Sequence, residues 1–394
     1  MELRKECANA IRALTMDAID KSKSGHPGAP MGMANMAEAL WRFAYKHNPK
    51  NPRWFNRDRF VLSNGHASML LYSLLHLTGY DLSMDDIKNF RRLHSKTPGH
   101  PEIERTAGVD IGTGPLGQGI ATAVGMALAE KLLAKKFNRE NHAVIDHKTW
   151  VFLGDGCLME GVAQEAISLA GTWKLNKLIA LYDSNAISID GDIKNWFTED
   201  VAKRFEASNW HVIKDIDGHN PEELDKALAA AQAVSEKPVL IICKTVIGYG
   251  SPNKAGKSSC HGSPMGSEEN EATKQALGWK YAPFEIPQHL YDAWNCVEKG
   301  KKANDEWDKA FQEYAKAYPE LAKELSRRIK GEFPPEYSEA FEKLFTDLLN
   351  AQEDIATRVA GKKVLDAIAQ SLPELLGGSA DLTGSVGTLH ANSK

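Results

Sequence analysis

Short apolar runs alternate with helical patterns through the first two thirds of the chain. Three of these runs are typical of buried strands and cover residues 149–153, 178–182 and 238–246. A helical pattern over 159–173 separates the first two runs, and a helix that Asn220 can cap and Pro221 can open precedes the third. The order strand, helix, strand, helix, strand predicts an α/β fold with a mainly parallel sheet flanked by helices.

Composition shifts twice further along the chain. Residues 248–266 are rich in Gly, Ser and Pro and contain His261, which predicts a functional loop rather than a regular element. Residues 295–345 carry Lys, Glu, Ala and aromatic residues at helical spacing, which predicts a helical connector, and 364–376 resembles a new amphipathic helix. We therefore expect a first domain over 1–320, a helical linker over 321–355 and the incomplete start of a second α/β domain over 356–394.

Charge and cysteine usage exclude several classes of protein. The 394 residues carry 48 Lys and Arg against 52 Asp and Glu, so there is no basic field for nucleic acid or an anionic membrane. The five cysteines are scattered and form no CxxC pair, which argues against a disulfide framework or zinc knuckle. With no signal peptide and no apolar run long enough to cross a bilayer, we expect a cytoplasmic protein without nucleic-acid or membrane partners.

Asp155 and Asn185 form the strongest local signal. Asp155, between Gly154 and Gly156, follows the strand over 149–153, and Asn185 follows the strand over 178–182. The carboxyl ends of neighbouring parallel strands meet at one edge of a sheet, where ligands bind. A carboxylate, an amide oxygen and a carbonyl such as that of Ile187 form an oxygen set that suits Mg²⁺. The pair favours a metal–diphosphate site, although Gly-Asp-Gly alone is also typical of a turn.

A glycine-rich segment over residues 112–119 leads directly into a helical pattern over 120–135. Such turns at helix N-termini bind anions or let a flat ring approach the backbone. The spacing is not GxGxxG after a strand, which argues against a dinucleotide. A tight turn that only packs the helix remains an alternative.

Four histidines stand beside glycine, proline or cysteine, outside regular elements: His26, His66, His100 and His261. An imidazole in such a loop can point into a cleft and exchange protons near neutral pH. Each taken alone is also consistent with a surface or capping histidine. The long intervals between them argue against a histidine zinc site.

Together these motifs resemble the N-terminal part of the transketolase family over essentially the whole chain. The matching segments are Ser24-Gly25-His26-Pro27-Gly28, Leu62-Ser63-Asn64-Gly65-His66, Thr113-Gly114-Pro115-Leu116-Gly117-Gln118-Gly119, Gly154-Asp155-Gly156, Ile187-Ser188-Ile189-Asp190, Gly218-His219 and Gly377-Gly378-Ser379-Ala380-Asp381-Leu382. Ala67 and Ala186 stand where the family pattern has glycine. The resemblance implies a thiamine diphosphate-binding fold with a diphosphate-binding domain, a linker and the start of a pyrimidine-binding domain.

The resemblance also implies a cofactor site. Asp155, Asn185 and the Ile187 carbonyl would bind Mg²⁺, for which Ca²⁺ can substitute. The implied cofactor contacts are His66, Gly114, Pro115, Leu116, Gly156, Asn185, His261 and Asp381. Thiamine diphosphate would supply the organic chemistry, and the protein would place the reactants and move protons.

The implied reaction moves a two-carbon ketol unit from xylulose 5-phosphate to ribose 5-phosphate or erythrose 4-phosphate, in the pentose phosphate pathway. His26, His100 and His261 would act on the sugar's hydroxyls and carbonyl as the C2–C3 bond breaks, and His26, Arg358 and Ser385 would bind the substrate. Glu160 and Glu165 resemble acids that link two sites across a homodimer. Without the family match, Arg358 and both glutamates are also consistent with solvated helix residues.

Two further hypotheses stay open at this point. In the family, the glutamate that activates the aminopyrimidine and an aromatic that stacks on it lie in later parts of the protein, so the 394-residue chain alone is expected to have little or no turnover. It would then be a non-catalytic fragment or one subunit of a split enzyme. A 1-deoxyxylulose-5-phosphate synthase or a dihydroxyacetone synthase is the alternative among thiamine enzymes.

Overall fold

The computed structural model describes residues 1–390 and 393 and divides into two compact units, Met1–Ala310 and Phe311–Lys394. The boundary falls within helix α12 (Val297–Ala317). The division of the chain into 1–320, 321–355 and 356–394 stays a prediction, and each unit is described by itself below.

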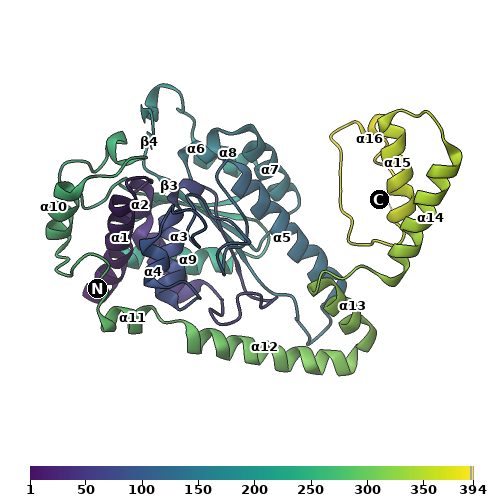
Figure 1. Cartoon of the computed structure of the whole chain (residues 1–394), viewed down its shortest axis with the longest axis horizontal. Helices are drawn as coiled ribbons and strands as arrows, with labels where there is room; N and C mark the ends of the chain where they lie inside the picture. The colour runs from purple at the N-terminus through teal and green to yellow at the C-terminus, as the bar shows by residue number, and fades with distance from the viewer. Residues whose placement is uncertain (391–392, 394) are drawn as a thin grey trace. The chain divides into compact units, whose positions relative to one another are not determined.

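The first unit is built on a five-stranded parallel sheet with the order β1-β2-β3-β7-β6 (Figure 1). The strands are β1 (Arg59–Leu62), β2 (Thr149–Gly154), β3 (Leu178–Ser184), β6 (His211–Asp217) and β7 (Val239–Lys244). A short antiparallel pair, β4 (Ile187–Ser188) and β5 (Gly191–Asp192), follows β3. The predicted mainly parallel sheet flanked by helices is confirmed. The sequence patterns missed β1 and β6.

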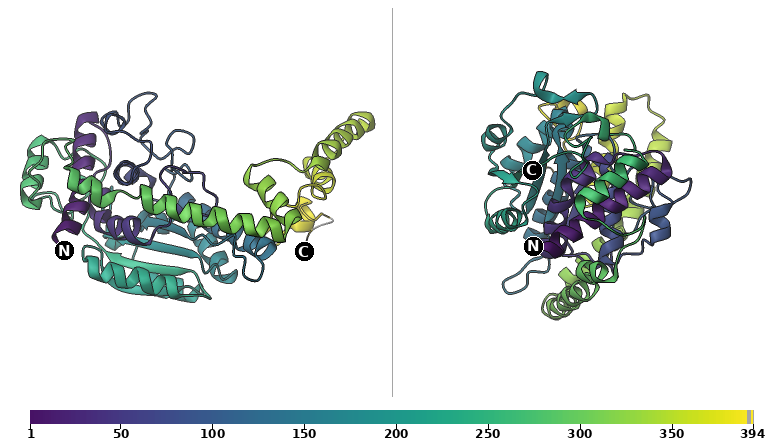
Figure 2. Two further views of the ribbon diagram at one scale, coloured as in Figure 1. Left: turned by 90° about the horizontal axis from the view of Figure 1, so that it is seen from below. Right: turned by 90° about the vertical axis from the view of Figure 1, so that its left-hand side faces the viewer.

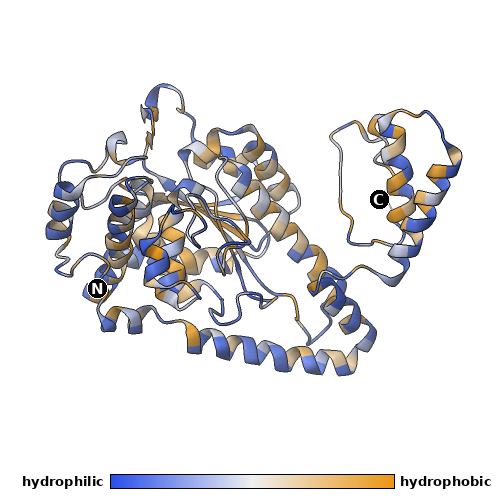
Figure 3. Cartoon of the chain, in the orientation of Figure 1, coloured by the Kyte–Doolittle hydropathy of each residue, from blue (hydrophilic) through white to orange (hydrophobic). Residues whose placement is uncertain are grey.

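Alternate residues of each strand enter two separate hydrophobic cores. On β2, Trp150 and Phe152 belong to one core, and Val151 and Leu153 belong to the other. Successive side chains of a strand point to opposite faces, so a sheet covered on both sides needs an uninterrupted apolar run. Figure 3 shows these strands as an apolar centre. The continuous apolar runs in the sequence therefore follow from burial on both faces.

Helices cover both faces of the sheet, as the right-hand view of Figure 2 shows. The first core joins one face to α1 (Glu2–Ser22), α2 (Gly28–Ala39), α3 (Ser68–Thr78), α4 (Met84–Lys88), α9 (Pro221–Ala233) and α11 (Gln288–Trp294). The second joins the other face to α5 (Gln118–Phe137), α6 (Asp155–Met159), α7 (Gly161–Thr172) and α8 (Val201–Ala207). Helix α10 (Ser267–Leu277) completes the unit. As predicted, Asn220 caps α9, accepting from the N–H groups of Glu222 and Glu223.

The second unit contains α13 (Pro319–Ile329), α14 (Pro335–Ala351), α15 (Thr357–Ile368) and α16 (Thr383–Val386). Its described residues form no strand, so a second α/β domain stays a prediction. The helix expected over 364–376 is wrong in its bounds. The helix α15 begins earlier, at Thr357, and ends at Ile368, before Pro373, whose ring and missing N–H prevent a helix from continuing through that position. Nowhere in residues 1–390 and 393 is a helix both long and apolar enough to span a bilayer.

Gly171 in α7 provides a test of the packing between α7 and the segment that contains Ser208. A Cβ atom there would lie 1.7 Å from the carbonyl oxygen of Ser208. Because overpacking forces the backbone to move, we expect Gly171→Ala to lower the free energy of unfolding by about 3 kcal/mol in a urea titration. Gly161→Ala in the same helix is the matched control, because nothing lies within 4 Å of its added Cβ. A shift no larger for Gly171→Ala than for Gly161→Ala would contradict this packing.

Candidate functional site

A cavity of about 190 Å³ lies where the segments after β1, β2 and β3 come together. Eight of the predicted site residues line it: His26, His66, Leu116, Asp155, Gly156, Asn185, Ile187 and His261. These residues come from six different segments of the sequence. The structure therefore brings most of the predicted cofactor, metal and catalytic residues of the first unit to one place.

The histidines form a tight cluster on this cavity. The ring of His66 lies 5.1 Å from that of His26 and 5.0 Å from that of His261, measured between centroids. His26 and His261 are 5.9 Å apart, and His100 lies 6.5 Å from His26. His26 precedes α2, His66 lies in a short turn after β1, and His261 follows a turn at Ser258–Cys260. Each ring is thus held by a loop at the end of a regular element.

The environment keeps these imidazoles neutral. Burial lowers the pKa of His66 to about 3, and His261 and His26 act in the same direction. Burial lowers the pKa of His26 to about 4, and the nearby guanidinium of Arg91, whose Nη2 is 3.4 Å from Nδ1 of His26, lowers it further. A neutral imidazole has one nitrogen that donates and one that accepts a hydrogen bond. The cluster can therefore donate hydrogen bonds to a bound hydroxyl or carbonyl and accept them from a hydroxyl.

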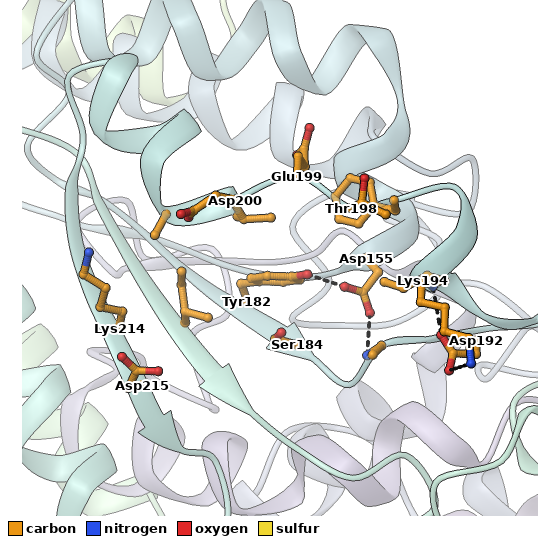
Figure 4. Close-up of a pocket in the computed structure, with 16 residues that line it drawn as sticks. Asp155, Tyr182, Ser184, Asp192, Lys194, Thr198, Glu199, Asp200, Lys214 and Asp215 are labelled. Atoms are coloured by element: carbon orange, nitrogen blue, oxygen red, sulfur yellow. Dashed lines mark hydrogen bonds and ion pairs between the residues drawn. The ribbon is translucent and has the colours of Figure 1, made fainter.

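Asp155 is held in a fixed orientation at the start of α6, directly after β2. The hydroxyl of Tyr182 donates to one carboxylate oxygen, and the N–H of Ala186 donates to the other at 3.1 Å (Figure 4). Asn185 donates to Asp183 at 2.9 Å, and its side-chain oxygen accepts from the N–H of Ile187 at 3.0 Å. The loop after β3 thus points its polar atoms toward the end of β2.

Two buried carboxyl groups at this site have no cationic partner among the described residues. Burial raises the pKa of Asp155 to about 6, against the opposing hydrogen bonds from Tyr182 and Ala186. Burial also raises the pKa of Asp183 to about 7, while the hydroxyl of Thr245 donates to it. A buried carboxylate needs a positive charge nearby to stay ionised. The oxygen atoms of Asp155, Asn185 and Ile187 are the ligand types that Mg²⁺ prefers, so the donor set fits a divalent cation.

The glycine-rich segment combines packing with proximity to the site. A Cβ at Gly119 would lie 2.4 Å from Cα of Ser63, and one at Gly117 would lie 2.6 Å from Cβ of Glu160. Those two glycines are needed for close packing, as the alternative interpretation of this segment expected. Gly114 lies beside the ring of His100, and Leu116 lines the cavity. Pro115 is exposed and is not among the lining residues.

The remaining predicted residues lie outside the cavity. Glu160 and Glu165 are exposed at α7. Arg358 is exposed on α15, Ser385 on α16 and Asp381 in the segment between them, all in the second unit. Their roles stay predictions.

Several residues that line the cavity, or that hydrogen-bond to its lining residues, were not singled out from the sequence. Tyr182, Asp183 and Thr245 contribute the hydrogen bonds described above, and Asn64 and Ile247 line the cavity. Asn64 has a buried side-chain oxygen without a partner among the described residues. Asp183 lies two residues before Asn185 at the same strand end, which is the one signal that pointed to it.

The fold and site define an α/β protein with a cavity at the carboxyl ends of its parallel strands, the edge at which such sheets bind ligands. The family "Transketolase, thiamine diphosphate binding domain" matches residues 3–334. Transketolase 1 of Escherichia coli strain K12 is 59% identical over 394 residues, covering 100% of this chain and 59% of that protein. Transketolase 1 of Vibrio cholerae is 55% identical over 394 residues, again covering 100% and 59%. This chain belongs to the transketolase family.

Solved structures agree with this assignment. A Pichia stipitis transketolase in complex with sedoheptulose-7-phosphate has a TM-score of 0.92 and 41% identity, covering 100% of this chain and 57% of that one. Transketolase from Campylobacter jejuni has a TM-score of 0.87 and 44% identity, covering 99% and 58%. The chain thus spans a little under three fifths of the length of these relatives.

The neutral histidines give a prediction about pH. In ¹H–¹³C spectra, the rings of His26 and His66 are expected to show no protonation between pH 5 and 8, whereas histidines of the urea-unfolded chain titrate near about 6.5. Since the unfolded state then binds protons that the folded state does not, stability should fall as the pH drops below about 6.5. His26→Gln and His66→Gln assign the signals. A midpoint above pH 6 for either ring would be inconsistent with this burial.

Proposed function

We propose that this chain forms the diphosphate-binding part of a thiamine diphosphate-dependent transketolase. The enzyme would move a two-carbon ketol unit from a ketose phosphate such as xylulose 5-phosphate to ribose 5-phosphate or erythrose 4-phosphate. The observation that carries the proposal is the single cavity shared by the Asp155–Asn185 pair and the histidine cluster. Membership of the transketolase family supports the same reaction.

Asp155, Asn185 and the carbonyl of Ile187 would hold Mg²⁺, or Ca²⁺ in its place. The cation would supply the positive charge that the two buried carboxyl groups lack and would bind the diphosphate oxygens. Gly156 lets the backbone approach closely, because a Cβ there would lie 2.8 Å from Cδ1 of Leu116. Bound thiamine diphosphate supplies the carbon that accepts the two-carbon unit of the ketose.

The histidines would bind the sugar and move its protons. Nδ1 of His261 is buried and has no partner among the described residues, so it is available to a ligand. His66 stacks on His261 at 24° between ring planes and fixes its orientation. His26, beside the positive charge of Arg91, would donate to a sugar oxygen, and His100 would act from the outer side of the cluster. Such positioned groups contribute typically about 10²–10⁴-fold to proton-transfer steps.

Three residues of the second unit have ligand-binding roles that the family resemblance implies. Arg358 and Ser385 offer guanidinium and hydroxyl donors suited to a sugar phosphate, and Asp381 would approach the cofactor. Glu160 and Glu165, exposed at α7, would face a partner subunit in a homodimer. We place this enzyme in the cytoplasm and in the pentose phosphate pathway, on the family resemblance.

Two alternatives have a specific basis. The acids that line the cavity are Asp155 and Asp183, both engaged in the hydrogen bonds above, and no described glutamate lines it. This favours a non-catalytic or split state of the 394-residue chain when it is alone. A 1-deoxyxylulose-5-phosphate synthase or dihydroxyacetone synthase has less support, because the similar proteins above are named transketolases.

The metal site gives a test of cofactor binding. Asp155→Asn is expected to weaken Mg²⁺-dependent binding of thiamine diphosphate at least about tenfold in calorimetric titrations, because it removes the one anionic ligand.

The same titrations on the wild type should depend on pH. Burial raises the pKa of Asp155 to about 6, so the cation must displace a proton at lower pH, and the affinity should fall about tenfold per pH unit below that value.

Asp215→Asn is the matched control for charge, because Asp215 is exposed on β6 and pairs with Lys244. It should bind cofactor as the wild type does. Equal binding by Asp155→Asn and wild type would remove the metal assignment.

The reaction itself is tested with two purified proteins. The natural polypeptide that carries this sequence, at its native length, should transfer the ketol unit between xylulose 5-phosphate and ribose 5-phosphate with Mg²⁺ and thiamine diphosphate. The 394-residue chain, checked by intact mass, should bind the cofactor but show no measurable turnover. Lack of transfer by the natural protein, or robust transfer by the 394-residue chain, contradicts the respective part of the proposal. A panel of 2-oxo acid and aldehyde substrates separates the alternative enzymes.

A further inference from the structure

A buried arginine on α1 has no counter-ion in the part of the chain that the structure describes. The Arg12 side chain is only 1% exposed, and its guanidinium donates to the carbonyl oxygen of Met31 at 3.0 Å. It also donates to the side-chain oxygens of Asn9 at 2.9 Å and Asn35 at 2.6 Å. All three acceptors are neutral. Fully buried charges are normally paired with an opposite charge, so this site has an unbalanced positive charge.

The carboxylates near this part of the fold do not neutralise Arg12. Glu38 lies one turn along α2 from Asn35 but pairs with Arg4 at 2.7 Å and with Arg42. Arg12 lines a cavity, described below, whose one acidic lining residue among the described residues is Glu2. The Glu2 side chain is exposed. Burial lowers the pKa of Arg12 to about 10, and the only group that opposes this shift is Tyr249. The guanidinium still carries its charge at neutral pH.

Arg12 lines a cavity of about 410 Å³ together with Asn9, Asn35, His219 and Tyr249. Cζ of Arg12 lies 4.6 Å from the centroid of the Tyr249 ring, which stacks on the ring of His219 at 3.9 Å. This cavity shares no lining residue with the one around Asp155. It is a separate site in the first unit.

Two groups that line this cavity, the His219 ring and the Arg12 guanidinium, have hydrogen-bond donors that are not used. Nε2 of His219 accepts from the N–H of Val246 at 3.0 Å, so Nδ1 carries the proton of the neutral ring. Nδ1 is buried and has no partner among the described residues. Burial lowers the pKa of His219 to about 4, which keeps this tautomer neutral. The guanidinium has five N–H groups, of which three make the hydrogen bonds given above.

A purely structural role leaves part of this arrangement unexplained. The three hydrogen bonds of Arg12 tie α1 to α2, which accounts for its position. They do not account for its uncompensated charge, for the spare guanidinium donors or for the unpartnered Nδ1 of His219. Phosphate and carboxylate groups carry negative charge and two or more acceptor oxygens, which guanidinium groups bind in a bidentate manner.

We propose that the cavity lined by Arg12, Tyr249 and His219 binds a small oxyanion, the phosphate or carboxylate group of a metabolite. The anion would accept from the two guanidinium N–H groups that make none of the hydrogen bonds given above and from Nδ1 of His219. This site is independent of the proposed transketolase reaction, so either assignment can fail without the other.

The test observes the site directly. ¹H–¹³C spectra of the 394-residue chain follow the ring of His219, assigned with His219→Gln, during titration with inorganic phosphate, with malonate and with potassium chloride at matched ionic strength. We expect a saturable shift of the His219 signal with phosphate, malonate or both, and none with chloride. The oxyanion that binds with the lower dissociation constant identifies the ligand class, which is a phosphate group for inorganic phosphate and a carboxylate group for malonate. Absence of a saturable shift with both, or an equal shift with chloride, overturns the proposal.

Variants separate this site from general anion effects. Arg12→Met should weaken the affinity for the oxyanion, measured from the His219 shift, at least about tenfold. This is the effect expected for loss of charge-assisted hydrogen bonds. Arg92→Met, an exposed change away from the cavity, should leave it unchanged. If Arg12→Met does not fold by circular dichroism, two exposed lining residues replace it: Glu2→Gln should tighten binding and Lys5→Glu should weaken it. Unchanged affinity in Arg12→Met, or in both exposed variants, overturns the proposal.

Discussion

The parallel pairing of β2 with β3 is the constraint on which the candidate site depends. Its register places Gly154 opposite Asp183, so the residues that follow the two strands leave the sheet at the same edge. Asp155 then starts α6 while Asn185 and Ile187 continue from β3. A shift of one residue would turn every side chain of a strand to the other face and exchange the side chains that the strand contributes to the two cores. The geometry of the candidate site and the packing of the cores are therefore fixed together.

Much of the fold and part of the site could be predicted from the sequence. β2, β3 and β7 are continuous apolar runs because both of their faces are buried, and the topology alone places Asp155 near Asn185. β1 escaped detection because it has only four residues. β6 is an edge strand with exposed polar residues and an irregularity between Ile213 and Ile216, so it lacks the apolar pattern.

The histidine cluster was predicted as a set of candidates but not as an arrangement. His26, His66 and His261 lie in loops, and their ring separations follow from packing between segments far apart in the sequence. Tyr182 was read only as part of a buried strand, yet its hydroxyl reaches Asp155. Periodicity assigns a side chain to a face, but it does not show where the end of a long side chain lies.

In the loop after β3, an unfavourable backbone conformation is offset by a hydrogen bond to a candidate site residue. Ala186 has φ of 60°, a left-handed conformation that costs a residue with a Cβ about 1–2 kcal/mol. In that conformation its N–H donates to the buried carboxylate of Asp155, and hydrogen bonds to charged groups contribute about 1.5–3 kcal/mol. Because the two terms are of similar size, an alanine can occupy this position without loss of the loop. The alanine at position 186, where the family resemblance implies glycine, is therefore compatible with the hydrogen bond that holds Asp155.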